Sequence, residues 1–119
     1  MILLVDDNPM VTTVVSEMLG VLGHKVTVAC NGQEAIQTYG VLGHNIDIVI
    51  LDVNMPGMDG IETYENLKKM NPEIKVLAIS GFCEEDKVEK ILGSGFHGFL
   101  QKPFEISDLS EMLKSIVET

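Results

Sequence analysis

Two cysteines make up the whole cysteine content of this 119-residue chain, and they do not form a CxxC pair. We therefore expect Cys30 and Cys83 to be reduced, semi-buried thiols rather than part of a disulfide framework. Long hydrophobic runs are missing as well, since no apolar stretch approaches the length of a bilayer span. The residues after Met1 show no charged segment and no cleavage site for export. These absences predict a cytoplasmic domain that makes no membrane contact.

Basic residues are scarce. The chain has 8 Lys and Arg against 18 Asp and Glu, which gives a net charge of −10. Because binding to phosphate backbones draws its affinity from clustered Lys and Arg, we expect no direct contact with nucleic acid. An acidic surface suits a basic protein partner or a divalent cation. Equally, it can simply keep the protein soluble without binding anything.

The length is that of one ordinary domain, which buries about two thirds of the surface of its unfolded chain. Short apolar runs alternate with segments whose apolar residues recur every three or four positions, a pattern that indicates amphipathic helices. The runs expected to be strands are residues 2–5, 25–29, 46–51, 75–79 and 96–100.

Helix-capping residues stand between several of these segments. Asn8 precedes Pro9, which favours an N-cap followed by proline in the first turn. Asn31, with Glu34 three residues later, resembles a capping box, and Asp59 is expected to cap the third helix. The helical stripes predict a set of core positions that includes Val14, Met18, Ile61, Tyr64, Leu67, Met70, Val88, Ile91, Leu92, Leu109, Ile116 and Val117.

Polar residues stand where four of the expected strands end. Asp6 and Asp7 follow the first strand, Asp52 the third, Ser80 the fourth and Lys102 the fifth. Strands that alternate with helices predict an α/β fold, with helices on both faces of a parallel sheet. Because ligands of such a sheet bind at the carboxyl ends of its strands, we expect these five side chains to meet at one edge.

A cluster of this composition suits phosphoryl chemistry. Carboxylates that are close together repel one another and need a counter-charge, and their oxygens suit Mg²⁺ better than a soft metal. The Lys102 ammonium and the Ser80 hydroxyl would complete a site that surrounds a phosphoryl group. Asp52 is the expected acceptor, because an ionised carboxylate attacks phosphorus directly and forms an acyl phosphate.

From end to end the chain resembles the receiver domains of two-component response regulators. The resemblance rests on four motifs in order: LLVDDN, ILDVNMPGMDG, AISG and FLQKPF. It implies a single receiver domain over residues 1–119, with a doubly wound, flavodoxin-like sheet in the strand order 2-1-3-4-5. It also implies Mg²⁺-dependent transfer of a phosphoryl group to Asp52 from a histidine kinase or a histidine phosphotransfer protein. Such a domain is a phosphorylation switch, with self-phosphorylation and self-dephosphorylation chemistry, rather than an enzyme with an external substrate.

The resemblance also implies a ligand set for the metal. Asp7 and Asp52 would bind Mg²⁺ directly, the backbone carbonyl of Asn54 would be a third protein ligand, and Asp6 would act through water.

A switch pair follows from the same resemblance. The Ser80 hydroxyl would move toward the phosphoryl group while the Phe99 ring turns inward, and these residues stand where many members have threonine and tyrosine. The partner surface would then comprise the fourth helix, the fifth strand and the fifth helix. The resemblance further predicts a cis peptide bond between Lys102 and Pro103.

Two rival functions use the same residues differently. A haloacid-dehalogenase-like phosphohydrolase also forms an aspartyl phosphate with Mg²⁺, but its nucleophile follows the first strand in a DxDx(T/V) motif, whereas Asp52 follows the third. Steady hydrolysis of small phosphate esters would favour that rival. A degenerate receiver that binds partners without phosphorylation is disfavoured by the intact acidic set.

The parent architecture is a separate question. The ISGF and FLQKPF segments resemble receivers attached to hybrid histidine kinases, which makes a domain of such a kinase the preferred interpretation. A stand-alone receiver is the alternative.

Overall fold

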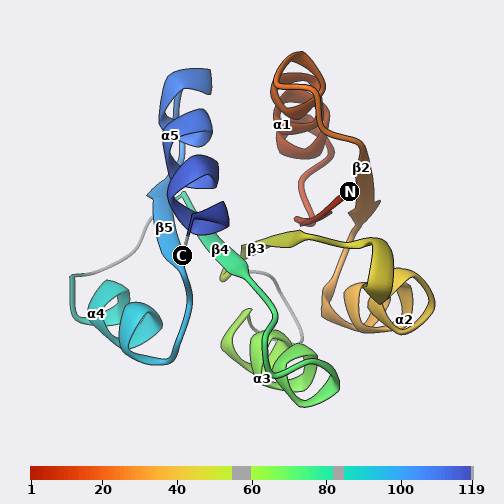
Figure 1. The fold of residues 1–119 in the computed structure, drawn as a ribbon. Coiled ribbons are helices and arrows are strands. Elements are labelled where there is room, and N and C mark those ends of the chain that lie inside the picture. The colour runs from red at the N-terminus through yellow and green to blue at the C-terminus, as the bar shows by residue number, and fades with distance from the viewer. Residues whose placement is uncertain (55–59, 82–84, 119) are drawn as a thin grey trace.

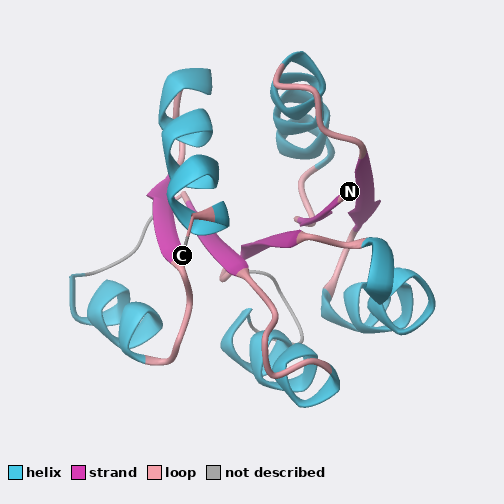
Figure 2. Ribbon diagram, viewed as in Figure 1, coloured by secondary structure: helices cyan, strands magenta, loops and turns pink. Residues whose placement is uncertain are grey.

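The computed structural model describes residues 1–54, 60–81 and 85–118, in which strands and helices alternate along the chain (Figure 2). The strands are β1 (Ile2–Val5), β2 (Val26–Ala29), β3 (Ile48–Asp52), β4 (Val76–Ser80) and β5 (Gly98–Gln101). The helices are α1 (Pro9–Val21), α2 (Gly32–Leu42), α3 (Gly60–Met70), α4 (Glu85–Gly93) and α5 (Ile106–Val117), with a short 3-10 turn at Gly43–Asn45.

The five strands form one parallel sheet in the order β2-β1-β3-β4-β5. Leu4 of β1 lies opposite Val28 of β2 on one side and Ile50 of β3 on the other. The strand order therefore reverses direction next to β1, and the carboxyl ends of β1 and β3 flank that point. This topology confirms the predicted doubly wound, flavodoxin-like fold.

Helices cover both faces of the sheet. In Figure 1, α1 and α5 lie on one face, and α2, α3 and α4 lie on the other. Side chains of each strand alternate between the faces, so that Ile48 and Ile50 pack with α1 and α5 while Val49 and Leu51 pack with α2 and α3. Strands with two buried faces read as continuous apolar runs, which explains why the sequence revealed them.

The helix starts agree with the predicted caps where the structure describes them. The Asn8 side chain accepts a hydrogen bond from the Met10 N–H at 2.9 Å, and Pro9 is the first residue of α1. The Asn31 side chain accepts one from the Glu34 N–H at 2.8 Å at the start of α2. The predicted cap Asp59 lies outside the described residues.

Several strands begin later than predicted. β3 starts at Ile48 rather than Ile46, and β5 starts at Gly98 rather than Phe96. Both early residues are buried, but the Ile46 N–H donates to the Gly43 carbonyl oxygen in the 3-10 turn and not to a neighbouring strand. The apolar run therefore shows which residues are buried. The strand itself begins only where the backbone of an adjacent strand is in position to hydrogen-bond with it.

Some predicted core positions are exposed. Val14 is 49% exposed and Leu92 is 47% exposed, although both were expected to face inward. Met70 and Val117, which are the last residues of α3 and α5, are exposed as well. The apolar face of a helix, when it is defined by residue spacing alone, is wider than the part of the helix that the sheet covers. Residues at the borders of that face and at the helix ends therefore remain exposed to solvent. Cys30 is a free, exposed thiol rather than a semi-buried one, and Cys83 lies outside the described residues.

Gly60, the first residue of α3, packs closely against the backbone just after β3. A Cβ atom added at Gly60 would collide with the backbone Cα atom of Val53, the residue after Asp52. We expect Gly60→Ala to lower the free energy of unfolding by about 2–3 kcal/mol, because a backbone atom cannot move aside as a flexible side chain does. Urea unfolding measures this loss, and Gly20→Ala, where the added atom meets nothing within 4 Å, is the control. Equal stability of the two variants would contradict the packing argument.

Candidate functional site

Asp6 and Asp7 begin the polar edge of the sheet. Four buried apolar residues of β1 lead into Asp6, which is only 1% exposed, and the next residue, Asp7, is exposed. The Asp6 Oδ1 atom accepts a hydrogen bond from the Asn8 N–H at 2.9 Å. Burial of a carboxylate is costly unless other groups compensate it, so the surroundings of Asp6 must supply more than this one bond.

Asp52 is the last residue of β3 and is 4% exposed. Its Oδ1 atom accepts a hydrogen bond from the Asn54 N–H at 2.8 Å, which folds the chain back over the carboxylate two residues after the strand. A rigid strand on one side and this short turn on the other hold the carboxylate in one place.

Lys102 joins the two buried acids. It follows β5, and its backbone N–H donates to the Ser80 carbonyl oxygen at 2.7 Å. The Nζ atom lies 2.8 Å from Asp6 Oδ2 and 3.2 Å from Asp52 Oδ2, with 18% of the side chain exposed. The ammonium group therefore compensates two carboxylates that would otherwise repel each other at close range. The peptide bond between Lys102 and Pro103 is cis, as predicted.

The three predicted acids come together. Carboxylate oxygens of Asp6, Asp7 and Asp52 all lie within 4.8 Å of one another. A set made only of carboxylate oxygens, one of them on the exposed Asp7, matches the ligand preference of Mg²⁺. The chemistry of the donors thus fits a hard divalent cation.

The electrostatics of the cluster are unusual. Burial, together with the neighbouring Asp6 charge, raises the pKa of Asp52 above its ordinary value, against the opposing effects of the Asn54 N–H and of Lys102. Although burial alone would lower it, the pKa of Lys102 is raised, because Asp6 and Asp52 both accept hydrogen bonds from the ammonium group and attract its charge. Asp52 is thus less favourably ionised than an exposed aspartate, and a further cation would relieve it.

Ser80 and Phe99 stand on the adjacent strands β4 and β5. Ser80, the last residue of β4, is completely buried, and its Oγ atom accepts a hydrogen bond from Asn54 Nδ2 at 2.5 Å. Phe99 of β5 lies opposite Ala78 of β4 and is half-buried against the cluster that α2, α3 and α4 cover. Sequence reasoning assigned only the backbone of Asn54, so the bond from its side chain to Ser80 is an addition. The one available signal was an amide residue two positions after the acid.

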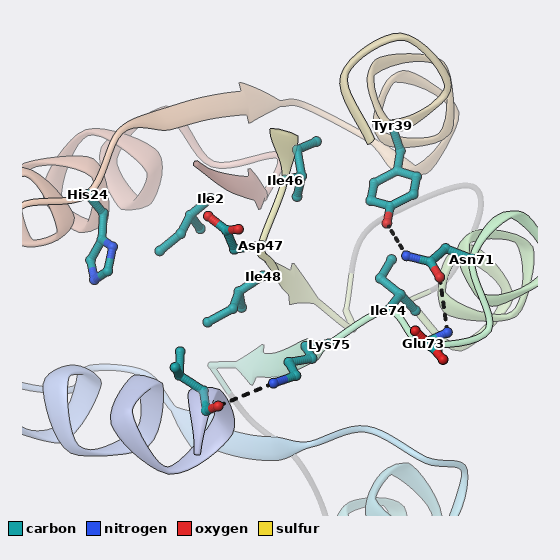
Figure 3. A pocket seen from close by; sticks show the side chains of 11 residues that line it. Ile2, His24, Tyr39, Ile46, Asp47, Ile48, Asn71, Glu73, Ile74 and Lys75 are labelled. Carbon is teal, nitrogen blue, oxygen red and sulfur yellow. Dashed lines mark hydrogen bonds between the residues drawn. The ribbon is translucent and has the colours of Figure 1, made fainter. Parts of the chain in front are cut away.

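Another cavity, of about 540 Å³, lies at the opposite edge of the sheet (Figure 3). Its floor is aliphatic, with Ile2 and Ile48 among its lining residues. Two hydrogen bonds join residues of its lining: Asn71 Nδ2 donates to the Tyr39 hydroxyl at 3.0 Å, and Lys75 Nζ donates to the Val117 carbonyl oxygen at 3.3 Å. None of the predicted site residues lines this cavity, so the acidic edge remains the candidate site.

The chain matches known proteins over nearly its whole length. The family model of the response regulator receiver domain matches residues 2–114. The sensor kinase CckA of Brucella abortus is 35% identical over 117 residues, which cover 98% of this chain. The match covers 12% of that kinase, so the chain spans only a small part of this relative's length.

Solved structures match along nearly the whole chain. A chain from the CheX-CheY-BeF3-Mg²⁺ complex of Borrelia burgdorferi superimposes with a TM-score of 0.92 and 30% identity, covering 98% of this chain and 87% of its own. The receiver domain of the sensor histidine kinase PA1611 from Pseudomonas aeruginosa, with a magnesium ion coordinated in its active-site cleft, gives a TM-score of 0.87 and 27% identity. That match covers 99% of this chain and 97% of its own.

Proposed function

Because the chain belongs to the response regulator receiver domain family of two-component signalling, we propose that it is a phosphoacceptor and that Asp52 receives the phosphoryl group. One observation carries the assignment to Asp52: it is the buried acid at the end of β3 whose carboxylate Lys102 contacts from one side, with Asp6 and Asp7 within 4.8 Å. The Lys102 ammonium group beside Asp52 would stabilise the negative charge of an incoming phosphoryl group.

The chemistry follows from the donor and the acceptor. An Asp52 oxygen attacks the phosphorus of a phosphohistidine on a histidine kinase or a histidine phosphotransfer protein. An oxygen–phosphorus bond forms, the phosphorus–nitrogen bond breaks, and the electron pair leaves with the imidazole nitrogen. The Lys102 ammonium, already next to Asp52, then binds an oxygen of the transferred group.

Metal binding completes the proposal. We assign Asp7, Asp52 and the backbone carbonyl of Asn54 as direct Mg²⁺ ligands, with Asp6 acting through water. The exposure of Asp7 suits a direct ligand, whereas Asp6 and Asp52 are both buried and both contact Lys102. The different roles of Asp6 and Asp52 therefore rest on the family resemblance. When bound, Mg²⁺ neutralises the charge of the transferred phosphoryl oxygens.

The signal leaves the site through Ser80 and Phe99. The Ser80 hydroxyl would bind a phosphoryl oxygen, and the Phe99 ring, half-buried on the neighbouring strand, would turn further inward. We place the partner surface on α4, β5 and α5. Resonance shifts confined to the acidic edge after phosphorylation would contradict that placement.

The donor protein is expected to dock beside α1. An apolar groove of about 430 Å³ opens there, and its lining includes Met10, Val14 and Phe104. Lys102 lines the same groove and contacts Asp52, so a protein seated in it would stand next to the acceptor. Met10 is 78% exposed and Val14 is 49% exposed, so both offer apolar surface to a protein that docks there.

The parent protein is proposed to be a hybrid histidine kinase, because nearly the whole chain matches a short stretch of the sensor kinase CckA of Brucella abortus. Within the described residues no helix has the length and apolar character that a membrane crossing demands. We propose that the domain works in the cytoplasm and acts as a switch rather than as an enzyme with its own substrate.

The decisive experiment incubates the protein with acetyl phosphate and Mg²⁺ and follows its intact mass. We expect one added phosphoryl group in the natural protein, no addition in Asp52→Asn and no addition when Mg²⁺ is chelated. Asp47→Asn is the matched control, because this exposed acid lies at the opposite edge of the sheet and should leave uptake unchanged (Figure 3). Equal uptake in Asp52→Asn would overturn the proposal. Steady hydrolysis of small phosphate esters would instead favour a phosphohydrolase.

A further inference from the structure

Asn54 connects the acceptor strand to the switch strand. Its backbone N–H donates to Asp52 Oδ1 at 2.8 Å, and its side-chain Nδ2 donates to Ser80 Oγ at 2.5 Å. β3 and β4 are adjacent in the sheet (Figure 1), and Asn54 bridges their carboxyl ends. One residue therefore holds the proposed phosphoryl acceptor through its backbone and the proposed switch hydroxyl through its side chain.

The bond to Ser80 fixes the position of its hydroxyl oxygen. A serine side chain turns about a single bond with three staggered positions, and a hydrogen bond to Oγ favours one of them. Ser80 is also completely buried, so its oxygen is held within a closely packed environment.

We propose that the Asn54 carboxamide is a latch that holds Ser80 in its resting position, an inference that rests on the proposed function. Binding of Ser80 to a phosphoryl oxygen on Asp52 requires the hydroxyl to leave the place it holds against Asn54. The Asn54–Ser80 bond must then break or lengthen, and its free energy opposes the switch. Asn54 is thus a positioning residue that sets how readily phosphorylation is converted into the active state.

A difference in affinity for a phosphoryl mimic measures the latch. Beryllofluoride with saturating Mg²⁺ serves as the probe, so that altered metal affinity does not enter the comparison. Because a neutral hydrogen bond contributes little net free energy, we expect Asn54→Ala to bind the probe about three- to tenfold more tightly than the natural protein. Asn54→Leu, which keeps the size of the side chain without its hydrogen bonds, is expected to do the same.

A double-mutant cycle separates the latch from any general effect of Asn54. In a Ser80→Ala background the hydroxyl is gone, so Asn54→Ala is expected to change beryllofluoride affinity by less than about twofold. The ring resonances of Phe99 give a second readout: in Asn54→Ala without the probe they should shift toward the positions seen in the probe-bound natural protein. Circular dichroism verifies that all variants are folded.

Each outcome has one meaning. An equal effect of Asn54→Ala in both backgrounds, or weaker binding in the presence of Ser80, would overturn the latch. If the natural protein binds the probe but shows no coupling between Asn54 and Ser80, only the latch fails. If the natural protein does not bind beryllofluoride and Mg²⁺ at all, the proposed phosphoacceptor function itself fails.

Discussion

Replacement of Lys102 by methionine is expected to lower the free energy of unfolding by about 2–4 kcal/mol in the absence of divalent cations. The reason is the geometry of the ammonium group, which lies 2.8 Å from Asp6 and 3.2 Å from Asp52, both almost fully buried. Removing it leaves two buried carboxylates that repel each other and have lost their shared donor. Urea unfolding with chelator present measures the loss.

The same variant should respond more strongly to magnesium than the natural protein. A divalent cation replaces the lost positive charge, so the stabilisation by millimolar Mg²⁺ is expected to be larger in Lys102→Met. Phosphoryl uptake should nevertheless fall by about 100-fold, because no ammonium group remains to bind the transferred oxygens. Lys114→Met in α5 is the control, since this exposed lysine should change stability by less than about 0.5 kcal/mol. If Lys102→Met behaves like the control, Lys102 does not hold the acidic edge together.

Asp52→Asn is expected to stabilise the protein while abolishing phosphoryl uptake. Burial and the charge of Asp6 raise the pKa of Asp52, so at neutral pH its carboxylate is less favourable in the folded protein than in the unfolded chain. Removing that charge should raise the free energy of unfolding by on the order of 1 kcal/mol without Mg²⁺. The addition of Mg²⁺ should stabilise the variant less than the natural protein, because a metal ligand is lost.

The pH dependence has a definite sign. An acid whose folded-state pKa is raised destabilises the fold when it is ionised. That penalty decreases as the pH falls through the raised pKa and vanishes below the unfolded value near 3.8. The stability difference between Asp52→Asn and the natural protein should therefore be largest at neutral pH and should narrow on acidification. A stability difference that widens toward low pH would contradict this account of Asp52.

Much of this architecture was predictable because strand ends are visible in the sequence. The buried run before Asp52 and the turn-forming residues after it locate the acid at the edge of a sheet, and the same reasoning locates Asp6 and Ser80. Because strands that alternate with helices form a parallel sheet, the ends of these strands lie at the same edge of that sheet. The structure brings all three acids and Lys102 together for that reason.

The remaining details depend on distances between strands, which no single segment encodes. The hydrogen bond from Asn54 to Ser80 joins the ends of two adjacent strands, and neither sequence segment alone predicts it. Lys102 was predicted to face a phosphoryl group, but which carboxylates it contacts in the resting protein depends on how closely β5 approaches β1 and β3. Val14 was assigned to the core by spacing alone, whereas its exposure depends on how far α1 is covered by its neighbours.

The most direct test of the account locates the phosphoryl group after incubation with acetyl phosphate and Mg²⁺. Borohydride reduces an aspartyl phosphate to homoserine, which peptide mass mapping identifies at a single position. The account predicts homoserine at residue 52 and at no other aspartate. Modification of another acid, or a phosphoryl group retained on a histidine or a serine, would contradict it.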